Sequence, residues 1–250
     1  HGQTQGATFE QRTGRTLAAL VAELCGEAAS GDRDAEAGNT ESSAWLRHAR
    51  PQDGTTATVA ADVPVVLGSG SLGLISLPGG PHRLTQEEID ARYPRLVSGL
   101  AGHPEIGFVL VRRATGTSVV LGNSGSLDLA TGAVVGDDPL APFGPRARDQ
   151  VAEVDAYGTA ADLMVNSRYD PDLEEVAAFE DQVSSHGGLG GPQTHPFLLY
   201  PAELSPPDPI FTSPAMHRVL KGWLAEVGLP IGGAPTAASA ADAAVSGGAP

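Results

Sequence analysis

Cysteine and basic residues are scarce in this chain, and the GxSxG motif of one large class of serine hydrolases is absent. Cys25 is the only cysteine among 250 residues, which excludes an internal disulfide, a thiolate zinc site and CxxC redox chemistry. Any metal site must therefore use His, Asp or Glu. Fifteen basic residues stand against 30 acidic ones, and the formal net charge of -15 disfavours binding to a nucleic-acid backbone.

Long apolar runs are also missing. No run approaches the roughly 20 residues that a membrane-spanning helix needs, and the start lacks the pattern of a signal peptide. We therefore expect this region to be soluble, with a hydrophobic content of 41% that is sufficient for a core. The chain starts on His1, and its methionines, Met164 and Met216, lie far inside, so we interpret it as the C-terminal part of a longer protein.

Apolar periodicity predicts both helices and strands. Spacings of three and four residues predict helices over 13–26, 85–102, 172–185 and 213–228. Thr85 and Glu88 form a capping-box pattern, and the acidic pairs Glu87–Glu88 and Glu174–Glu175 stand where they would stabilise helix starts. Short apolar or alternating runs predict strands over 62–70, 72–78, 106–113, 118–123, 126–135, 162–169 and 195–201.

These elements indicate an α/β or α+β layered domain, because strands and helices are mixed without a strict βαβ repeat. We expect residues 1–232 to form one portion of such a domain. Within it, the stretch 26–62 is rich in Ala, Ser, Gly and acidic residues, and we expect it to be a mobile insertion. The Ala-, Gly- and Pro-rich residues 233–250 are predicted to form a disordered tail.

Most of the apparent motifs have structural explanations. Gly68, Gly70 and Gly73 fit GxGxxG, but the segment after them continues as a strand, so a turn or bulge is favoured over a dinucleotide site. His48, His82, His103 and His217 each stand alone in polar or helical surroundings, which is typical of solvated or capping histidines. His195 precedes a proline at a predicted strand entrance, and we interpret it as a loop residue.

Two histidine–glycine pairs, unlike these motifs, are candidates for metal ligands. His186, in "SSHGGLGGPQTHPFLLYP", is followed by glycines that allow close approach of a ligand, and by a predicted strand that would hold the turn against a core. His1 opens "HGQTQGATF". Neutral imidazole is a favoured zinc ligand where cysteine is lacking. The residues alone leave open whether His186 is a metal ligand or a polar residue in a loose turn.

These segments resemble the type I phosphodiesterase and nucleotide pyrophosphatase branch of the alkaline phosphatase superfamily. In that branch a strand ends in Asp-His-Gly, and a later His-Gly turn precedes a final core strand. "RLTQEEIDARYPRLVSGLAGHPEIGFVLVRR", "DDPLAPFGP" and "DLMVNSRYDPDLEEVAAFEDQVSSHGG" are also similar to bacterial members that carry an N-terminal membrane region. The resemblance runs from His1 to about Leu224 and is weakest through 26–62.

The resemblance implies an alkaline phosphatase-like mixed sheet flanked by helices. It also implies two divalent metal ions, of the zinc class, bridged by the phosphate of an ester substrate, with His1 and His186 serving different ions. The Thr or Ser nucleophile and the other ligands of the family belong to segments nearer the N-terminus, so no catalytic residue is expected within this chain. The N-terminal remainder would then be its necessary partner.

The predicted function is therefore the C-terminal part of a metal-dependent phosphodiesterase or nucleotide pyrophosphatase, inactive on its own. The resemblance suggests that an N-terminal membrane region anchors the intact protein. No residue of this chain determines its localisation. Two alternatives remain at this point. One is a non-catalytic module that binds a partner through its acidic surface, and the other is a phosphomonoesterase or sulfatase-like hydrolase of the same superfamily.

Overall fold

The computed structural model describes residues 3–26, 63–79, 82–181 and 184–230. The expected insertion lies outside these residues from position 27 onward, and so does the expected tail. The chain divides into two compact units, His1–Pro196 and Phe197–Pro250. No helix in the described ranges is both long and apolar enough to cross a membrane.

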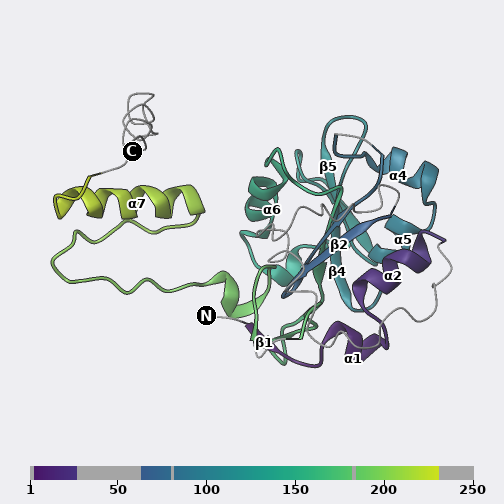
Figure 1. The fold of residues 1–250 in the computed structure, drawn as a ribbon, viewed down its shortest axis with the longest axis horizontal. Coiled ribbons are helices and arrows are strands. Elements are labelled where there is room, and N and C mark those ends of the chain that lie inside the picture. Colours follow the sequence, from purple (N-terminus) through teal and green to yellow (C-terminus); the bar gives the residue numbers. More distant parts are fainter. Residues whose placement is uncertain (1–2, 27–62, 80–81, 182–183, 231–250) are drawn as a thin grey trace, which may run out of the picture. The chain divides into compact units, whose positions relative to one another are not determined.

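The first unit is built around a seven-stranded sheet in which every neighbouring pair is antiparallel (Figure 1). The strand order is β2-β3-β8-β4-β5-β6-β7. The strands are β2 (Val65–Ser69), β3 (Leu72–Ser76), β4 (Ile106–Arg112), β5 (Ser118–Leu121), β6 (Gly125–Asp128), β7 (Val134–Gly136) and β8 (Leu163–Ser167). The strands predicted over 62–70, 72–78, 106–113, 118–123 and 162–169 are thus confirmed. The single strand predicted over 126–135 is wrong, because residues 129–133 separate β6 from β7 and the two pair as a hairpin.

The two faces of this sheet bury separate sets of side chains. Along β4, Val109 and Val111 belong to one core cluster, and Phe108 and Leu110 to the other. This alternation follows from the two-residue period of a strand. Because helices cover both faces, the central strands carry continuous apolar runs with little polar alternation.

Among the described residues, four short α-helices pack against the first cluster, and one α-helix and one 3-10 helix pack against the second. They are α1 (Phe9–Thr13), α2 (Leu17–Leu24), α4 (Gln86–Arg92) and α5 (Leu96–Ala101) on one face, and α6 (Ala147–Asp155) with the 3-10 helix η1 (Ala141–Phe143) on the other. Figure 1 shows α2, α4 and α5 on one side of the sheet and α6 on the other. The helix predicted over 13–26 is confirmed as α2. Helices α1 and α6 were not predicted from the sequence.

The helix predicted over 85–102 is two helices. Its start is as expected, because the Thr85 hydroxyl accepts a hydrogen bond from the Glu88 N–H and the Glu88 carboxylate accepts one from the Thr85 N–H. The bond from the Thr85 N–H also lowers the pKa of the Glu88 carboxyl. The first helix ends at Arg92 because Pro94 lacks an N–H and disfavours helical geometry at Tyr93.

A second, four-stranded sheet has the order β11-β1-β10-β9. Its strands are β1 (Gln3–Gln5), β9 (Tyr169–Asp170), β10 (Glu175–Val176) and β11 (Ser184–Ser185). Strand β1 pairs parallel to β10 and antiparallel to β11, with Gln3 opposite Ser185. The prediction of a sheet flanked by helices is confirmed for the large sheet, but that sheet is antiparallel where a mixed sheet was expected. Parallel pairing between described strands is confined to the small sheet.

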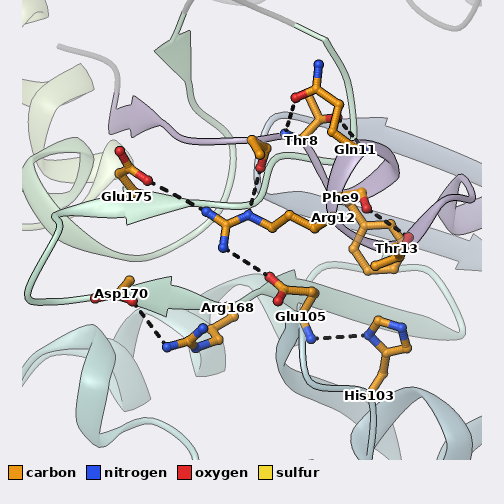
Figure 2. Close-up of polar contacts among 11 residues, drawn as sticks. Thr8, Phe9, Gln11, Arg12, Thr13, His103, Glu105, Arg168, Asp170 and Glu175 are labelled. Atoms are coloured by element: carbon orange, nitrogen blue, oxygen red, sulfur yellow. Dashed lines mark hydrogen bonds and ion pairs between the residues drawn. The ribbon is translucent and has the colours of Figure 1, made fainter.

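Arg12 fixes the segment that follows β1 (Figure 2). Its guanidinium lies 3.6 Å from the carboxylates of both Glu105, just before β4, and Glu175, in β10. Its Nε also donates to the Ala7 carbonyl at 2.9 Å. Each ion pair is partly exposed and contributes little alone, but together they join the N-terminal segment to both sheets.

The prediction of a helix over 172–185 is wrong. Residues 171–174 form a turn, in which the Asp170 carboxylate accepts the N–H groups of Asp172 and Leu173 and Glu174 has a φ of 52°. Glu175 and Val176 then pair with β1, so Glu174–Glu175 do not begin a helix. Four consecutive residues, 176–179, are buried, and a helix could not direct all four to one core face.

The prediction of a buried strand over 195–201 is also wrong. These residues form no strand, and Phe197 and Leu199 are 68% and 88% exposed. Pro196 and Pro201 remove two backbone donors that pairing would require. Apolar composition alone therefore did not distinguish a core strand from an extended segment.

The second unit contains the amphipathic helix predicted over 213–228. Helix α7 (Ser213–Glu226) is capped by the Thr212 hydroxyl, which accepts the Ala215 N–H, and the chain turns at Gly228. Trp223 is the one buried hydrophobic side chain among residues 197–230. Its indole stacks on Tyr200, with ring centroids 4.7 Å apart, and donates to the Ser205 carbonyl.

Candidate functional site

His186 lies in the turn that follows β11, and it is exposed. Gly187, the next residue, has a φ of 88°, and a Cβ at this position would collide with the Ser69 carbonyl. Glycine is therefore required here by another segment of the chain, and the close approach of a ligand to this turn stays a prediction. The side chain of His186 is accessible while its backbone is tightly packed.

The β2–β3 hairpin holds one side of this turn. Ser71 N–H donates to the His186 carbonyl at 3.0 Å. Gly70 has a φ of 58°, and a Cβ there would overlap the His186 backbone. The Gly70 N–H donates to the Glu180 carboxylate at 2.6 Å. Gly68, Gly70 and Gly73 thus belong to a hairpin, which confirms the preference for a turn over a dinucleotide site.

Asn166, near the end of β8, holds the other side. Its Oδ1 accepts the Leu189 N–H at 2.7 Å, and its Nδ2 donates to the carbonyls of Leu189 at 3.2 Å and Ser167 at 2.9 Å. The side chain is 1% exposed. Because both ends of the amide are engaged, Asn166 ties the residues after His186 to the central sheet.

Further polar atoms surround the turn. Gly188 packs on the Asn166 amide and the Ser71 hydroxyl, so that a Cβ at Gly188 would lie 2.5 Å from both Oδ1 and Oγ. The Gln193 Nε2 donates to the Ser71 Oγ at 3.2 Å. The Gln193 Oε1 and the hydroxyls of Ser167 and Ser185 are buried and have no hydrogen-bond partner among the described residues. A hydrogen-bonded frame, rather than the expected downstream strand, therefore fixes the turn.

Sequence reasoning missed this frame. Asn166 and Ser167 stand in the apolar run "DLMVNSRY", and the available signal was that two small polar residues occupy a strand predicted to be buried. Buried polar groups require partners, so this position pointed to a second polar segment. The sequence did not show that the partner segment would be 186–189.

His1, the other predicted metal ligand, lies outside the described residues. The described chain resumes at Gln3, two residues later, and Gln3 pairs with Ser185, directly before His186. The segments that adjoin the two predicted ligands are therefore neighbours in one sheet, although they come from opposite ends of the first unit. Whether the two imidazoles share a cleft stays a prediction.

The other described histidines have ordinary surroundings. His103 accepts the Glu105 N–H through Nδ1 at 3.2 Å and lies against Phe9 (Figure 2). Burial, with a smaller contribution from Arg15, lowers the pKa of His103, and Glu105 partly opposes this shift. His82 lies 3.7 Å from the Glu88 carboxylate, and His195 and His217 are exposed. His48 lies outside the described residues.

Metal binding at this site would need ligands in addition to His186. An exposed neutral imidazole is suited to a zinc-class ion, which usually takes three or four protein ligands. Within the described ranges, no group of three His, Cys, Asp or Glu side chains converges on one point.

No known family, curated protein or solved structure matches this chain.

Proposed function

We propose that this chain is the C-terminal part of a metal-dependent phosphodiesterase or nucleotide pyrophosphatase, with His186 and His1 as ligands of two zinc-class ions. The observation that carries the proposal is the pairing of β1 with β11. It aligns Gln3, close to His1, with Ser185, next to His186. The described residues that flank the two histidine–glycine pairs are thereby neighbours although they are distant in the sequence, which supports a shared site.

The backbone around His186 supports the same proposal. The Ser71 N–H holds the His186 carbonyl, and Asn166 holds Leu189 on the other side of the turn. A metal ligand benefits from such restraint, because the imidazole is then directed before the ion binds. A polar residue in a loose turn has no need of this frame.

The chemistry of the ions sets what this chain would contribute. Two such ions, when bound, stabilise charge on the attacking and leaving oxygens of a phosphate ester and activate the nucleophile. His186 would supply one neutral nitrogen ligand, and His1 a second. Because imidazole ligands are neutral, they do not reduce the positive charge of the ions. This charge would offset the negative charge of the chain near an anionic substrate.

The test is a zinc titration of residues 1–250, prepared without a histidine tag and followed by NMR of the imidazole signals. We expect weak binding that perturbs His186 before the other described histidines, because most ligands of the full site are not within the described residues. His186→Ala should abolish this perturbation. His195→Ala, which removes an exposed histidine nine positions later, is the matched control and should leave it intact.

Other outcomes discriminate the alternatives. If zinc perturbs the signals of His195 and His217 as strongly as those of His186, the metal site is contradicted. The non-catalytic module that binds a partner through its acidic surface is then favoured. Tight stoichiometric zinc binding, or hydrolysis of an aryl phosphodiester, contradicts a fragment that lacks its nucleophile. If methyl sulfate strengthens zinc binding at His186 and methyl phosphate does not, the sulfatase-like alternative replaces the phosphodiesterase.

A further inference from the structure

A small pocket of about 100 Å³ adjoins the glycine turn after His186. It lies on the α6 face of the large sheet, where strands β3, β4 and β8 meet that helix and the turn. The residues that line it are Leu72, Phe108, Gln150, Val151, Val154, Met164, Asn166, Gly187, Gly188 and Leu189. The pocket therefore lies between the second core cluster and the turn that follows His186.

The lining is mainly apolar. Phe108, Val151 and Met164 are buried members of the second core cluster and present hydrocarbon or thioether surface. The polar side chains in the wall are the half-buried Gln150 and the buried Asn166, and the Asn166 amide already bonds to Leu189 and Ser167. A polar occupant would find few partners here, whereas an apolar one would remove hydrocarbon surface from water.

The volume limits the occupant. The pocket is smaller than an apolar cavity of about 150 Å³ that accommodates benzene, so its occupant can be no larger than one six-membered ring or a short branched alkyl group. It excludes a purine nucleoside. Gly187 lines the pocket and directly follows His186, and consecutive Cα atoms lie about 3.8 Å apart. A group seated here would therefore bring its attached ester close to the backbone of His186.

We propose that this pocket binds the small apolar substituent, a phenyl group or a short branched alkyl group, of the phosphate ester that the site hydrolyses. The identification of the occupant as part of an ester rests on the proposed function. The affinity of the pocket for a small apolar group does not, because it depends only on the lining. The pocket would select substrates by the size of one ester substituent.

A larger cavity of about 520 Å³ lies elsewhere in the first unit and carries no comparable inference. Its lining includes Leu127, Val134 and Arg148, and none of the residues that surround His186. The Arg148 guanidinium already donates to the carbonyls of Leu129 and Ala130. Its charge is thus used within the protein, and no feature of this cavity identifies a ligand.

The methionines provide a direct test. The chain has two, Met164 in the pocket and Met216 in α7 of the other unit, so methyl-labelled methionine gives one probe and one internal control. We expect phenol and phenyl phosphate to produce a saturable ring-current shift of the Met164 methyl signal, with Met216 unchanged. Methyl phosphate, which has no ring, should bind at least about tenfold more weakly, because it buries little apolar area.

A substitution that fills the pocket with a larger side chain is the second part of the test. Val154 is a half-buried lining residue of α6, and Val154→Phe should abolish the response to phenol. Ala156→Phe adds the same ring at an exposed position just after α6 and should retain it. Circular dichroism and the unliganded methionine spectra report whether each variant folds. No Met164 response to phenol in the unsubstituted chain, or an equal response of Met216, overturns the pocket.

The two proposals fail separately. Phenol binding is measured without metal, so a Met164 response combined with no zinc preference for His186 supports the pocket and contradicts the hydrolase. Selective zinc binding at His186 without a Met164 response supports the hydrolase site and contradicts the pocket.

Discussion

Both the oxygen and the nitrogen of the Asn166 amide form hydrogen bonds with the backbone, including that of Leu189 in the turn after His186. Substitution by aspartate removes the donor and keeps the acceptor. In Asn166→Asp, Oδ1 can still accept the Leu189 N–H, but the second oxygen faces the carbonyls of Leu189 and Ser167. We expect the free energy of unfolding at pH 7 to fall by about 1–3 kcal/mol, the usual cost of leaving buried polar groups unpaired. Urea denaturation measures this loss.

The pH dependence separates this cause from a general packing defect. Burial and the two facing carbonyls would raise the pKa of the introduced carboxyl above its ordinary value, so the folded state would bind the extra proton first. The destabilisation should be fully present above that raised pKa and should diminish as the pH falls through it toward the unfolded value. Asn123→Asp, at an exposed position, is the control. A loss of the same size at every pH would contradict this account.

Two hairpin turns of the large sheet offer a comparison between elements. Gly70, between β2 and β3, and Gly116, between β4 and β5, have φ angles of 58° and 86°. A Cβ at Gly70 would overlap the His186 backbone, whereas a Cβ at Gly116 would meet nothing within 4 Å. We expect Gly116→Ala to cost about 1–2 kcal/mol from left-handed strain. Gly70→Ala should cost more, because the His186 turn must also move.

Thermal unfolding of the two alanine variants tests this difference, and the NMR signals of His186 report the movement directly. These signals should change in Gly70→Ala and stay in place in Gly116→Ala. Equal losses of stability, with His186 unaffected in both, would show that the hairpin does not position the candidate ligand.

Local patterns predicted the elements whose stability is mostly local. The apolar spacing of α2, the capping box at Thr85 and the turn around Gly70 were predicted correctly, because each depends on neighbouring residues. The segment 172–185 was misread because its pairing with β1, far away in the sequence, prevails over its helical periodicity. The segment 195–201 was misread because apolar residues do not make a strand without a partner.

At the scale of the whole molecule, the candidate site depends on contacts between distant segments. His186 could be selected from its glycines, but the frame that holds it comes from β2–β3, β8 and the segment beyond β10. Periodicity carries no information on which strands meet. The resemblance to known phosphodiesterases suggested that the two histidine–glycine segments belong together, and the pairing of Gln3 with Ser185 is consistent with that suggestion.

The two units differ in how much apolar surface they bury, and this difference predicts two unfolding transitions. The first unit contains two core clusters, whereas Trp223 is the one buried hydrophobic residue among residues 197–230. The stacking of Trp223 on Tyr200 and its bond to Ser205 are contacts within the second unit. A unit with so little burial gains little free energy from folding, so it should unfold at a lower urea concentration.

Trp45→Phe leaves Trp223 as the sole tryptophan, so that its fluorescence reports the second unit while far-UV circular dichroism reports mainly the first. We expect the fluorescence midpoint to precede the circular dichroism midpoint. Adding Tyr200→Ala should lower the fluorescence midpoint alone, because the ring that it removes contacts Trp223. Non-coincident probes are the sign of separate cooperative units. Coincident midpoints that shift together in the Tyr200 variant would instead mean that residues 197–230 unfold as part of the larger unit.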